Sequence, residues 1–392
     1  MILHHTTAFG TTERQVRSVA RASESRLRIS RWLDADADGL VLTGPAAVAW
    51  ACGGVAPPVD RTAAVDLVWA AFTAEGSWLI TTNVEAERIK TEYDPAEHGF
   101  DGLAEVPWYF PGGFITAAAE LTGIPPGQLA SDGHPAFGRD ASDELVALRL
   151  ALSEAEAHDL TDLGADAAAA LQDGLAKWQP GETDLDIQAR CAGYLEAAGA
   201  DAPVLIVGGD DRLERYRHPM AVGAPVRRLA MAVAVARRDG LHVALTRFAA
   251  SAPPGQAYGV LRRKVLAIED AVLAACVPGA TYGAAVESLA AAYAAAGADG
   301  EWKNHYQGGP IGFAQREFEI APGQNGSRWY GQRIEAGHAV AWNPSLAGGA
   351  KSEDTYLVTP NGQLSLVTTA PGWPTDVSEG GSSRPAVLEV GR

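Results

Sequence analysis

Two segments of this chain carry the same turn residues at a fixed separation, and this repeat restricts the possible folds more than any other feature. Pro180-Gly181 opens a helical pattern that ends at Gly199, and Pro278-Gly279 opens another that ends at Gly297. In both segments the two glycines are 18 residues apart, and the second segment follows the first by 98 residues. An amphipathic helix precedes each segment and apparent strands follow it. Alanine-rich helices can match by chance, but the matched Pro-Gly starts favour a duplication. We therefore predict two αα–ββ halves that face each other across a central cleft.

The rest of the chain divides around this repeat. Residues 1–140 alternate short helical and strand patterns, including a strand at 106–109, which predicts a smaller α/β domain. Residues 123–139 are rich in Pro, Gly and Asp and are predicted to form the linker. The duplicated domain is then expected over 141–375, and the Ser/Gly-rich residues 376–392 are expected to be a disordered tail.

Composition restricts the partners and the compartment. A net charge of −17 argues against nucleic acid or an anionic membrane as a partner. The N-terminal residues lack a basic region followed by an apolar one, and no apolar run approaches the roughly 18 residues of a membrane span. The cysteines, Cys52, Cys191 and Cys276, are sparse and far apart, as is typical of reduced thiols. We expect a cytoplasmic protein that acts on a small molecule.

Three segments that follow the second half of the repeat concentrate polar chemistry. Residues 302–313 hold His305, Gln307 and a dense set of glycines, which allow close approach of the backbone to a ligand. Residues 337–345 and 351–355 follow along the chain. These segments predict one site assembled from successive strands. The alternative, a Gly-rich hairpin loop beside two ordinary strands, stays open at this stage.

A family resemblance rests on several of these features together. The duplicated halves, His218-Pro219, the Gly-rich histidine segment and residues 352–359 resemble the pita-bread superfamily, which includes methionine aminopeptidase, aminopeptidase P, prolidase and creatinase. The resemblance covers roughly residues 141–375, and residues 40–109 resemble the smaller N-terminal domain of the creatinase/prolidase branch. It implies an α/β (α+β) fold in which a pita-bread domain of duplicated αα–ββ halves follows a smaller α/β domain. It also implies a homodimer.

The resemblance also implies where metal ligands would lie. The superfamily's peptidases hold paired metal ions with two Asp, one His and two Glu, because hard cations prefer charged oxygen donors. The second Asp position, just before Thr246-Arg247, is Ala244, and the first is Val233. The first Glu position is Asn343. We therefore predict that Val233 and Ala244 line a metal-free apolar floor, and that Asn343 nearby supplies neutral hydrogen bonds.

Only a histidine and one carboxylate of that ligand set remain, namely His305 or a neighbouring residue and Glu353. Creatinase hydrolyses a C–N bond within this fold without metal, using His and Glu side chains. The resemblance thus favours a metal-independent, creatinase-like enzyme that cleaves or rearranges a C–N bond of a small amino-acid-derived substrate, with no cofactor. One alternative is a metal-dependent Xaa-Pro aminopeptidase or dipeptidase that uses Mn or Co. Another is a non-catalytic module that binds peptides or a protein.

The expected catalytic residues are His218, His305 and Glu353. His218 would be a general acid or base, because an imidazole titrates near neutral pH. His305 would bind substrate or transfer a proton, and Glu353 would orient a histidine or bind a substrate cation. Each also has a structural interpretation: a loop histidine, a brace for the Gly-rich loop and a surface acid at a strand end.

The expected substrate-binding residues are polar groups and one aromatic ring. Gln307 and Asn343 would contact polar groups of the substrate. Trp342 could form a pocket wall, although such a tryptophan more often belongs to the core. Arg247 could contact substrate but is equally expected to brace its strand. Arg316-Glu317, after the glycine-rich segment, could be a surface pair.

Overall fold

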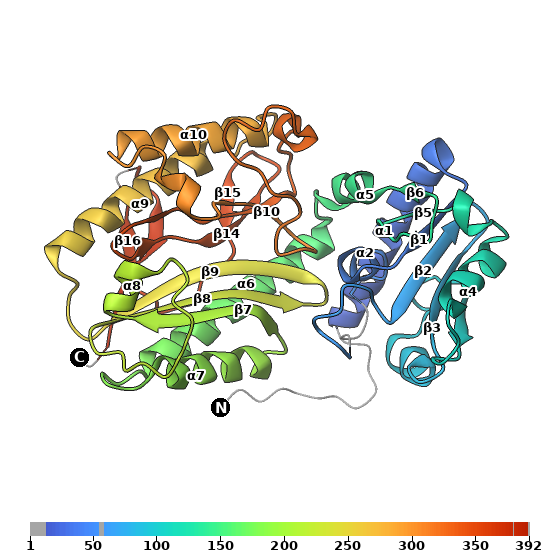
Figure 1. Cartoon of the computed structure of the whole chain (residues 1–392), viewed down its shortest axis with the longest axis horizontal. Helices are drawn as coiled ribbons and strands as arrows, with labels where there is room; N and C mark the ends of the chain where they lie inside the picture. Colours follow the sequence, from blue (N-terminus) through green and yellow to red (C-terminus); the bar gives the residue numbers. More distant parts are fainter. Residues whose placement is uncertain (1–12, 55–58, 379, 391–392) are drawn as a thin grey trace. The chain divides into compact units, whose positions relative to one another are not determined.

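The computed structural model describes residues 13–54, 59–378 and 380–390. The described residues divide into two compact units, one up to Arg149 and one from Leu150 (Figure 1). The predicted boundary after residue 140 lies slightly earlier, because helix α5 (Ser142–Arg149) packs with the first unit. Its Leu148 carbonyl accepts a hydrogen bond from Arg28 Nη1 at 3.1 Å. The predicted absence of a signal peptide concerns residues that lie outside the described part.

The first unit is built on a mixed sheet with the strand order β4-β3-β2-β1-β5-β6. Helices cover this sheet, and Trp69 lies in the core that they enclose. The strands are β1 (Gly39–Leu42), β2 (Val68–Thr73), β3 (Ser77–Thr82), β4 (Gly102–Val106), β5 (Ala130–Ser131) and β6 (Arg139–Asp140). The helices are α1 (Glu13–Asp36), α2 (Pro45–Ala51), α3 (Ala86–Arg88), η1 (Ile89–Tyr93), α4 (Gly113–Thr122), η2 (Pro126–Gln128) and α5.

Two details of the first unit differ from the sequence-based expectation. The predicted linker, residues 123–139, contains β5 and reaches into β6, and β5 pairs in parallel with β1. The predicted strand at 106–109 ends at Val106, because Pro107 has no N–H to continue the ladder. Trp108 and Tyr109 are each 69% exposed.

The second unit contains the predicted duplication. Helix α7 (Asp184–Ala197) and helix α10 (Tyr282–Ala295) have the same length of 14 residues. Each helix begins after a threonine, Thr183 or Thr281, whose side chain accepts a hydrogen bond from a backbone N–H of the first turn. Gly181 and Gly279 both adopt positive φ, at 105° and 90°, which a residue with a side chain rarely adopts. The internal repeat is therefore confirmed at the level of caps and turns.

Each half continues into its own sheet, one with the order β18-β9-β8-β7 and the other with the order β10-β11-β14-β15. The first half contains α6 (Glu154–Ala176), α7, β7 (Asp201–Gly209), α8 (Asp211–Arg215), β8 (Leu229–Arg238) and β9 (Leu241–Ala250). The second half contains α9 (Gln256–Ala274), α10, η3 (Glu301–Asn304), β10 (Gly308–Ile311), η4 (Arg328–Gly331), β11 (Ala339–Trp342), β12 (Ser345–Leu346), β13 (Ala350–Lys351), β14 (Asp354–Val358) and β15 (Leu364–Leu366). This arrangement confirms the predicted fold class.

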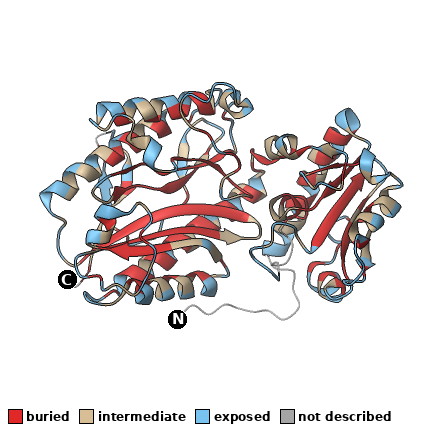
Figure 2. Ribbon diagram, in the orientation of Figure 1, coloured by how far each residue is buried: buried red, intermediate tan, exposed pale blue. Residues whose placement is uncertain are grey.

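The two sheets of the second unit meet between β9 and the start of β14. Thr246 N donates to Glu353 O at 2.9 Å, and Ala244 N donates to Thr355 Oγ1 at 2.8 Å. Every residue of β9 is buried, as Figure 2 shows for the long central strands. This junction brings the retained Thr-Arg and Glu-Asp motifs together.

The predicted disordered tail instead contains short strands. Residues of β16 (Thr375–Val377) and β17 (Ser383–Pro385) pair with each other, and β18 (Leu388–Glu389) adds to β9 in parallel. Arg384 explains why this segment is ordered. Its buried guanidinium pairs with two acids of α9, Glu269 at 3.0 Å and Asp270 at 2.6 Å. Residues 379, 391 and 392 lie outside the described part.

Candidate functional site

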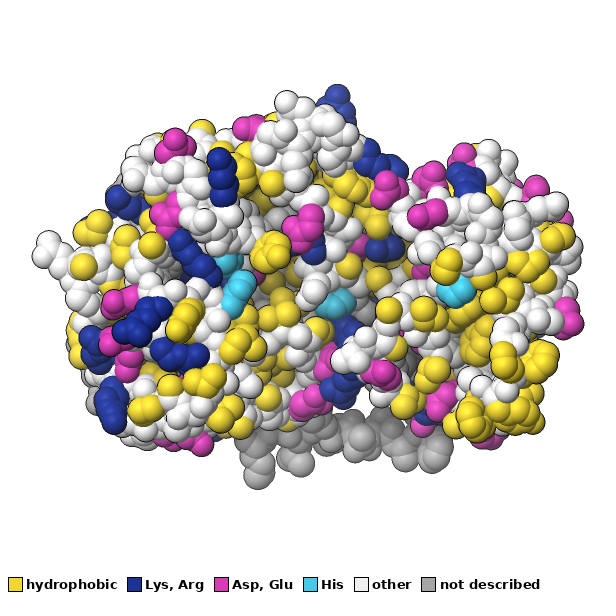
Figure 3. Space-filling model, viewed as in Figure 1, with side chains coloured by type: hydrophobic (Ala, Val, Ile, Leu, Met, Phe, Trp, Pro, Cys, Tyr) yellow, Lys and Arg dark blue, Asp and Glu magenta, His cyan; other side chains and the backbone are white. Residues whose placement is uncertain are grey.

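Two histidines expected to be catalytic lie in contact. His218 follows α8 and is exposed, whereas His305 follows η3 and is half-buried. Their Nε2 atoms are 3.2 Å apart. Two ring nitrogens at this distance share one hydrogen, so one imidazole donates and the other accepts. Histidine side chains reach the face of the second unit in Figure 3, near basic and hydrophobic side chains.

Both imidazoles are held in the neutral form. Partial burial of the imidazole lowers the pKa of His218, and the positive charge of Lys351 lowers it further, although Glu353 opposes this. Burial lowers the pKa of His305 to about 3, with added repulsion from Lys351, His218 and Arg217. At neutral pH the pair therefore has a free lone pair available to accept a proton.

Glu353 lies at the junction of the two sheets and is 5% exposed. Its Oε2 accepts a hydrogen bond from Thr246 Oγ1 at 2.9 Å and lies 3.6 Å from Lys351 Nζ. Lys351 is two residues before Glu353, and both side chains are buried. The retained carboxylate is thus neutralised by a side-chain cation.

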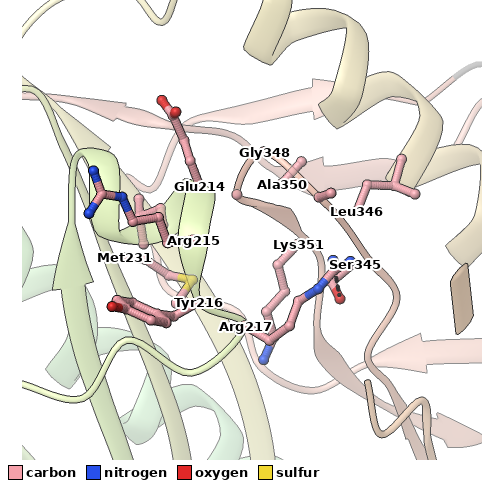
Figure 4. A pocket seen from close by; sticks show the side chains of 13 residues that line it. Glu214, Arg215, Tyr216, Arg217, Met231, Ser345, Leu346, Gly348, Ala350 and Lys351 are labelled. Atoms are coloured by element: carbon pink, nitrogen blue, oxygen red, sulfur yellow. Dashed lines mark hydrogen bonds between the residues drawn. The ribbon is translucent and has the colours of Figure 1, made fainter. Parts of the chain in front are cut away.

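A pocket of about 230 Å³ opens beside this junction (Figure 4). Lys351, Arg217 and Ser345 form one part of its lining, and the loop around α8 forms another. Arg217 donates to Ser345 Oγ at 3.1 Å and pairs with Glu301. A small molecule in this pocket would contact Lys351, whose charge already acts on both histidines.

The apolar floor that the sequence predicted faces Glu353. Val233 pairs with Thr246 across β8 and β9, and Ala244 lies two residues from Thr246 on the same strand. Side chains at these positions point to one face of the sheet, the face from which Thr246 reaches Glu353. Val233 and Ala244 are 3% and 4% exposed. They offer no ligand atom to a metal.

The residues at the junction therefore do not fit the paired metal ions of the superfamily's peptidases. The superfamily's peptidases have an Asp or a Glu at four positions, and Glu353 is the one carboxylate that this chain has at those positions. Glu353 already faces the ammonium group of Lys351. A second cation, Arg316, acts electrostatically on Glu353. A group of residues with metal-ligating atoms close together occurs elsewhere in the described part, at His158, Asp159 and Asp162 of α6, of which His158 and Asp162 are exposed.

Gln307 and Asn343 brace the histidine loop. Gln307 is 7% exposed, donates to the carbonyls of Trp302 and His305 and accepts from Tyr293 OH. These contacts use its amide, so the predicted substrate contact of Gln307 is not supported. Asn343 N donates to Gln307 O at 2.8 Å, whereas its buried Oδ1 has no hydrogen-bond partner in the described part of the chain.

Two predicted substrate-binding residues point away from this site. Arg247 follows Thr246 and lies on the opposite face of β9, where it pairs with Asp354 at 2.8 Å and donates to Thr368 O. It braces the strands, as the alternative held. Trp342 is fully buried, and its Nε1 donates to Cys276 Sγ at 3.2 Å. Trp342 therefore belongs to the core, as the alternative held, and does not form a pocket wall.

Sequence reasoning missed the basic part of the site. Lys351 lies only two residues before Glu353 and pairs with it, so this short spacing was a usable signal. Thr246 was noted only as a marker for its neighbours. Arg217 carries no local signal, because its partners Glu301 and Ser345 are distant in the chain. Arg316 was named only with Glu317 as a possible surface pair, but the Arg316 side chain is 19% exposed and Glu317 is 8% exposed.

The family of the chain is shown by comparison with known proteins. Residues 156–360, just over half of the chain, match the model of metallopeptidase family M24. None of the curated proteins matches the sequence.

Solved structures share the fold over nearly the whole chain. An X-Pro aminopeptidase from Thermotoga maritima MSB8 is 16% identical, covers 93% of this chain and 99% of its own, and superposes with a TM-score of 0.69. Dipeptidase PepE from Mycobacterium ulcerans is 20% identical, with 98% and 99% covered and a TM-score of 0.64. The N-terminal domain of FACT complex subunit SPT16 from Cicer arietinum (chickpea) is 12% identical, with 92% and 97% covered and a TM-score of 0.64. Within the described residues no helix is both long and apolar enough to cross a membrane. The chain belongs to metallopeptidase family M24 and has the pita-bread fold of that superfamily.

Proposed function

We propose that the second unit hydrolyses a C–N bond in a small amino-acid-derived molecule, and that it does so without a metal ion. The observation that carries this proposal is the neutral pair of His218 and His305, 3.2 Å apart, beside a buried carboxylate. Family membership and the dipeptidase and aminopeptidase neighbours support an amide or peptide bond as the target. The apolar residues at two ligand positions support metal independence.

His218 is the proposed general base, because it is the exposed member of the pair. When its Nε2–H donates to His305 Nε2, its Nδ1 keeps a free lone pair. A water molecule placed at that nitrogen would lose a proton to it as its oxygen attacks the carbonyl carbon of the substrate. The proton would then pass from His218 to the leaving nitrogen as the C–N bond breaks. His305 would hold the ring of His218 in this tautomer.

Hydrolysis of a panel of dipeptides and small amides by the chelator-treated protein tests the proposal. His218→Gln should abolish turnover of any accepted substrate. His158→Gln is the matched control, because His158 is exposed on α6 and outside the site. Since the pKa of His218 is lowered, the rate should rise with pH below neutrality and reach a plateau above it.

Dependence on Mn or Co would overturn the metal-independent part. If chelator abolishes turnover and added Mn²⁺ or Co²⁺ restores it, the protein is a metal-dependent peptidase whose ligands differ from those of the superfamily. If turnover survives chelation but also survives His218→Gln, the assignment of the base is wrong.

A second candidate is a non-catalytic module that binds a peptide or a protein. The presence of Val233 and Ala244 at the Asp positions favours it, and one structural neighbour is the N-terminal domain of a subunit of the FACT complex. This candidate predicts no turnover of any amide in the panel, together with peptide binding that His218→Gln leaves unchanged.

A further inference from the structure

The cationic side chains around Glu353 have hydrogen-bonding capacity that the protein does not use. Lys351 is 5% exposed, and its Nζ has no hydrogen-bond partner among the described residues. The nearest acid, Glu353 Oε2, is 3.6 Å away, beyond hydrogen-bond distance, and already accepts from Thr246. A buried ammonium with three unused donors is costly unless another group supplies an acceptor.

Arg316 is a second cation whose hydrogen-bond donors are only partly used by the protein. Its guanidinium lies over β10, where a Cβ added to Gly309 would lie 3.5 Å from Nη1. Nη1 makes one long contact, 3.4 Å, to Ala341 O, and Nε has no hydrogen-bond partner within the described part. The carboxylate of Glu319, 3.7 Å from Nε, is 65% exposed and therefore a weak partner.

The charges around the junction do not balance. Lys351 and Arg316 both act on Glu353, which supplies one negative charge for two positive ones. His218 and His305 are neutral near pH 7, and Arg217 is already paired with Glu301. One of the two cations is thus left without a buried counter-ion, because the other carboxylate beside Arg316, that of Glu319, is 65% exposed. Lys351 lines the neighbouring pocket (Figure 4).

We propose that Lys351 and Arg316 are resident cations that bind an anionic oxygen of the substrate. In this role they provide the positive charge that metal ions supply in the superfamily's peptidases. The ligand is a small oxyanion, either a carboxylate already present in the substrate or the tetrahedral oxyanion formed when water adds to its carbonyl. The identity of the oxyanion rests on the proposed hydrolysis, whereas its binding does not.

Binding of two matched probes tests this proposal without any turnover. N-acetylglycine carries a planar carboxylate, and N-acetylaminomethylphosphonate carries a tetrahedral anion of similar size. Calorimetry on the chelator-treated full chain should show that at least one probe binds in the millimolar range or better, and more weakly as salt is added. Tighter binding of the phosphonate would assign the site to the tetrahedral oxyanion, and tighter or equal binding of the carboxylate to the substrate's own group.

Lys351→Met and Arg316→Gln should each weaken binding by about tenfold or more, since a hydrogen bond to a charged group is lost. Lys351→Arg keeps the charge and should bind within about threefold of wild type. Lys303→Met is the control, because Lys303 is exposed. The melting temperature of each variant shows whether it is folded.

Absence of binding to either probe at millimolar concentration would overturn the proposal. So would unchanged binding in folded Lys351→Met. Anion binding without turnover would reject the proposed hydrolysis and leave this inference standing. Turnover without anion binding would reject this inference alone.

Discussion

Replacing Arg384 with methionine should strongly destabilise the second unit. Arg384 is 5% exposed and pairs with Glu269, which is 1% exposed. Glu269 Oε2 also accepts a hydrogen bond from Ser352 Oγ at 2.8 Å, and Ser352 is the residue directly before Glu353 in the chain. Arg384→Met keeps the apolar stem but leaves a buried carboxylate without its cation, so the free energy of unfolding should fall by about 3–5 kcal/mol at pH 8.

The loss should be smaller at pH 5.5. Burial already raises the pKa of Glu269 to about 7 from 4.5, although Arg384 opposes the shift, so the variant's pKa is higher still. Between the unfolded and native pKa values only the native state holds the proton, so Glu269 reduces stability as pH rises through this window. Each unit of additional pKa shift is worth about 1.4 kcal/mol. At pH 5.5 a protonated Glu269 removes most of the uncompensated charge.

Hydrogen exchange read by mass spectrometry is the suitable assay, because a chain with two compact units can unfold in more than one step. Peptides from β9 and β14 should lose protection in Arg384→Met at pH 8, and less at pH 5.5 after correction for the intrinsic exchange rate. Arg228→Met is the matched control: Arg228 and its partner Asp211 are each 68% exposed, so their pair contributes less than about 1 kcal/mol. If Arg384→Met costs no more than Arg228→Met, or costs the same at both pH values, the reasoning about Glu269 is refuted.

Three further predictions concern the floor, an internal histidine and one glycine. The triple variant Val233→Asp, Ala244→Asp, Asn343→Glu should have a lower melting temperature than wild type, since buried carboxylates cost several kcal/mol. Added Mn²⁺ or Co²⁺ should raise that melting temperature. A variant that melts like wild type and does not respond to metal would show that the assigned register is wrong. Burial lowers the pKa of His242 from 6.5 to about 4, so the free energy of unfolding falls as pH decreases through this range, by at most about 3.4 kcal/mol. In His242→Asn the unfolding midpoint should depend less on pH in this range, and an unchanged slope would contradict this. Gly308→Ala should lower the free energy of unfolding by about 2 kcal/mol or more, because φ is +95° and a Cβ would lie 2.2 Å from the Ala341 carbonyl oxygen. Thermal unfolding measures this change, and a variant as stable as wild type would disprove the clash.

The repeat and the fold were predictable from the sequence because their signals are local. A threonine that caps a helix, and a glycine that takes positive φ before it, act within a few residues, so the matched starts at Gly181 and Gly279 could be read directly. The same holds for Glu353, which its Glu-Asp motif marked. The predicted tail failed for the opposite reason: its Ser/Gly-rich composition says nothing of Arg384, whose partner Glu269 lies more than a hundred residues earlier.

The tertiary structure alone decided which neighbouring residue faces the site. Thr246 and Arg247 are adjacent in one motif, yet Thr246 reaches Glu353 and Arg247 reaches Asp354 on the other side. A strand alternates its faces, so the sequence limits each residue to one of two sides, and only the pairing with β8 and the contact with β14 select the side. Arg316 shows the same dependence, because its guanidinium meets the Ala341 carbonyl of β11 where β10 pairs with that strand. The motifs of the site were therefore set by the sequence, whereas its charge was set by side chains that the fold brings together.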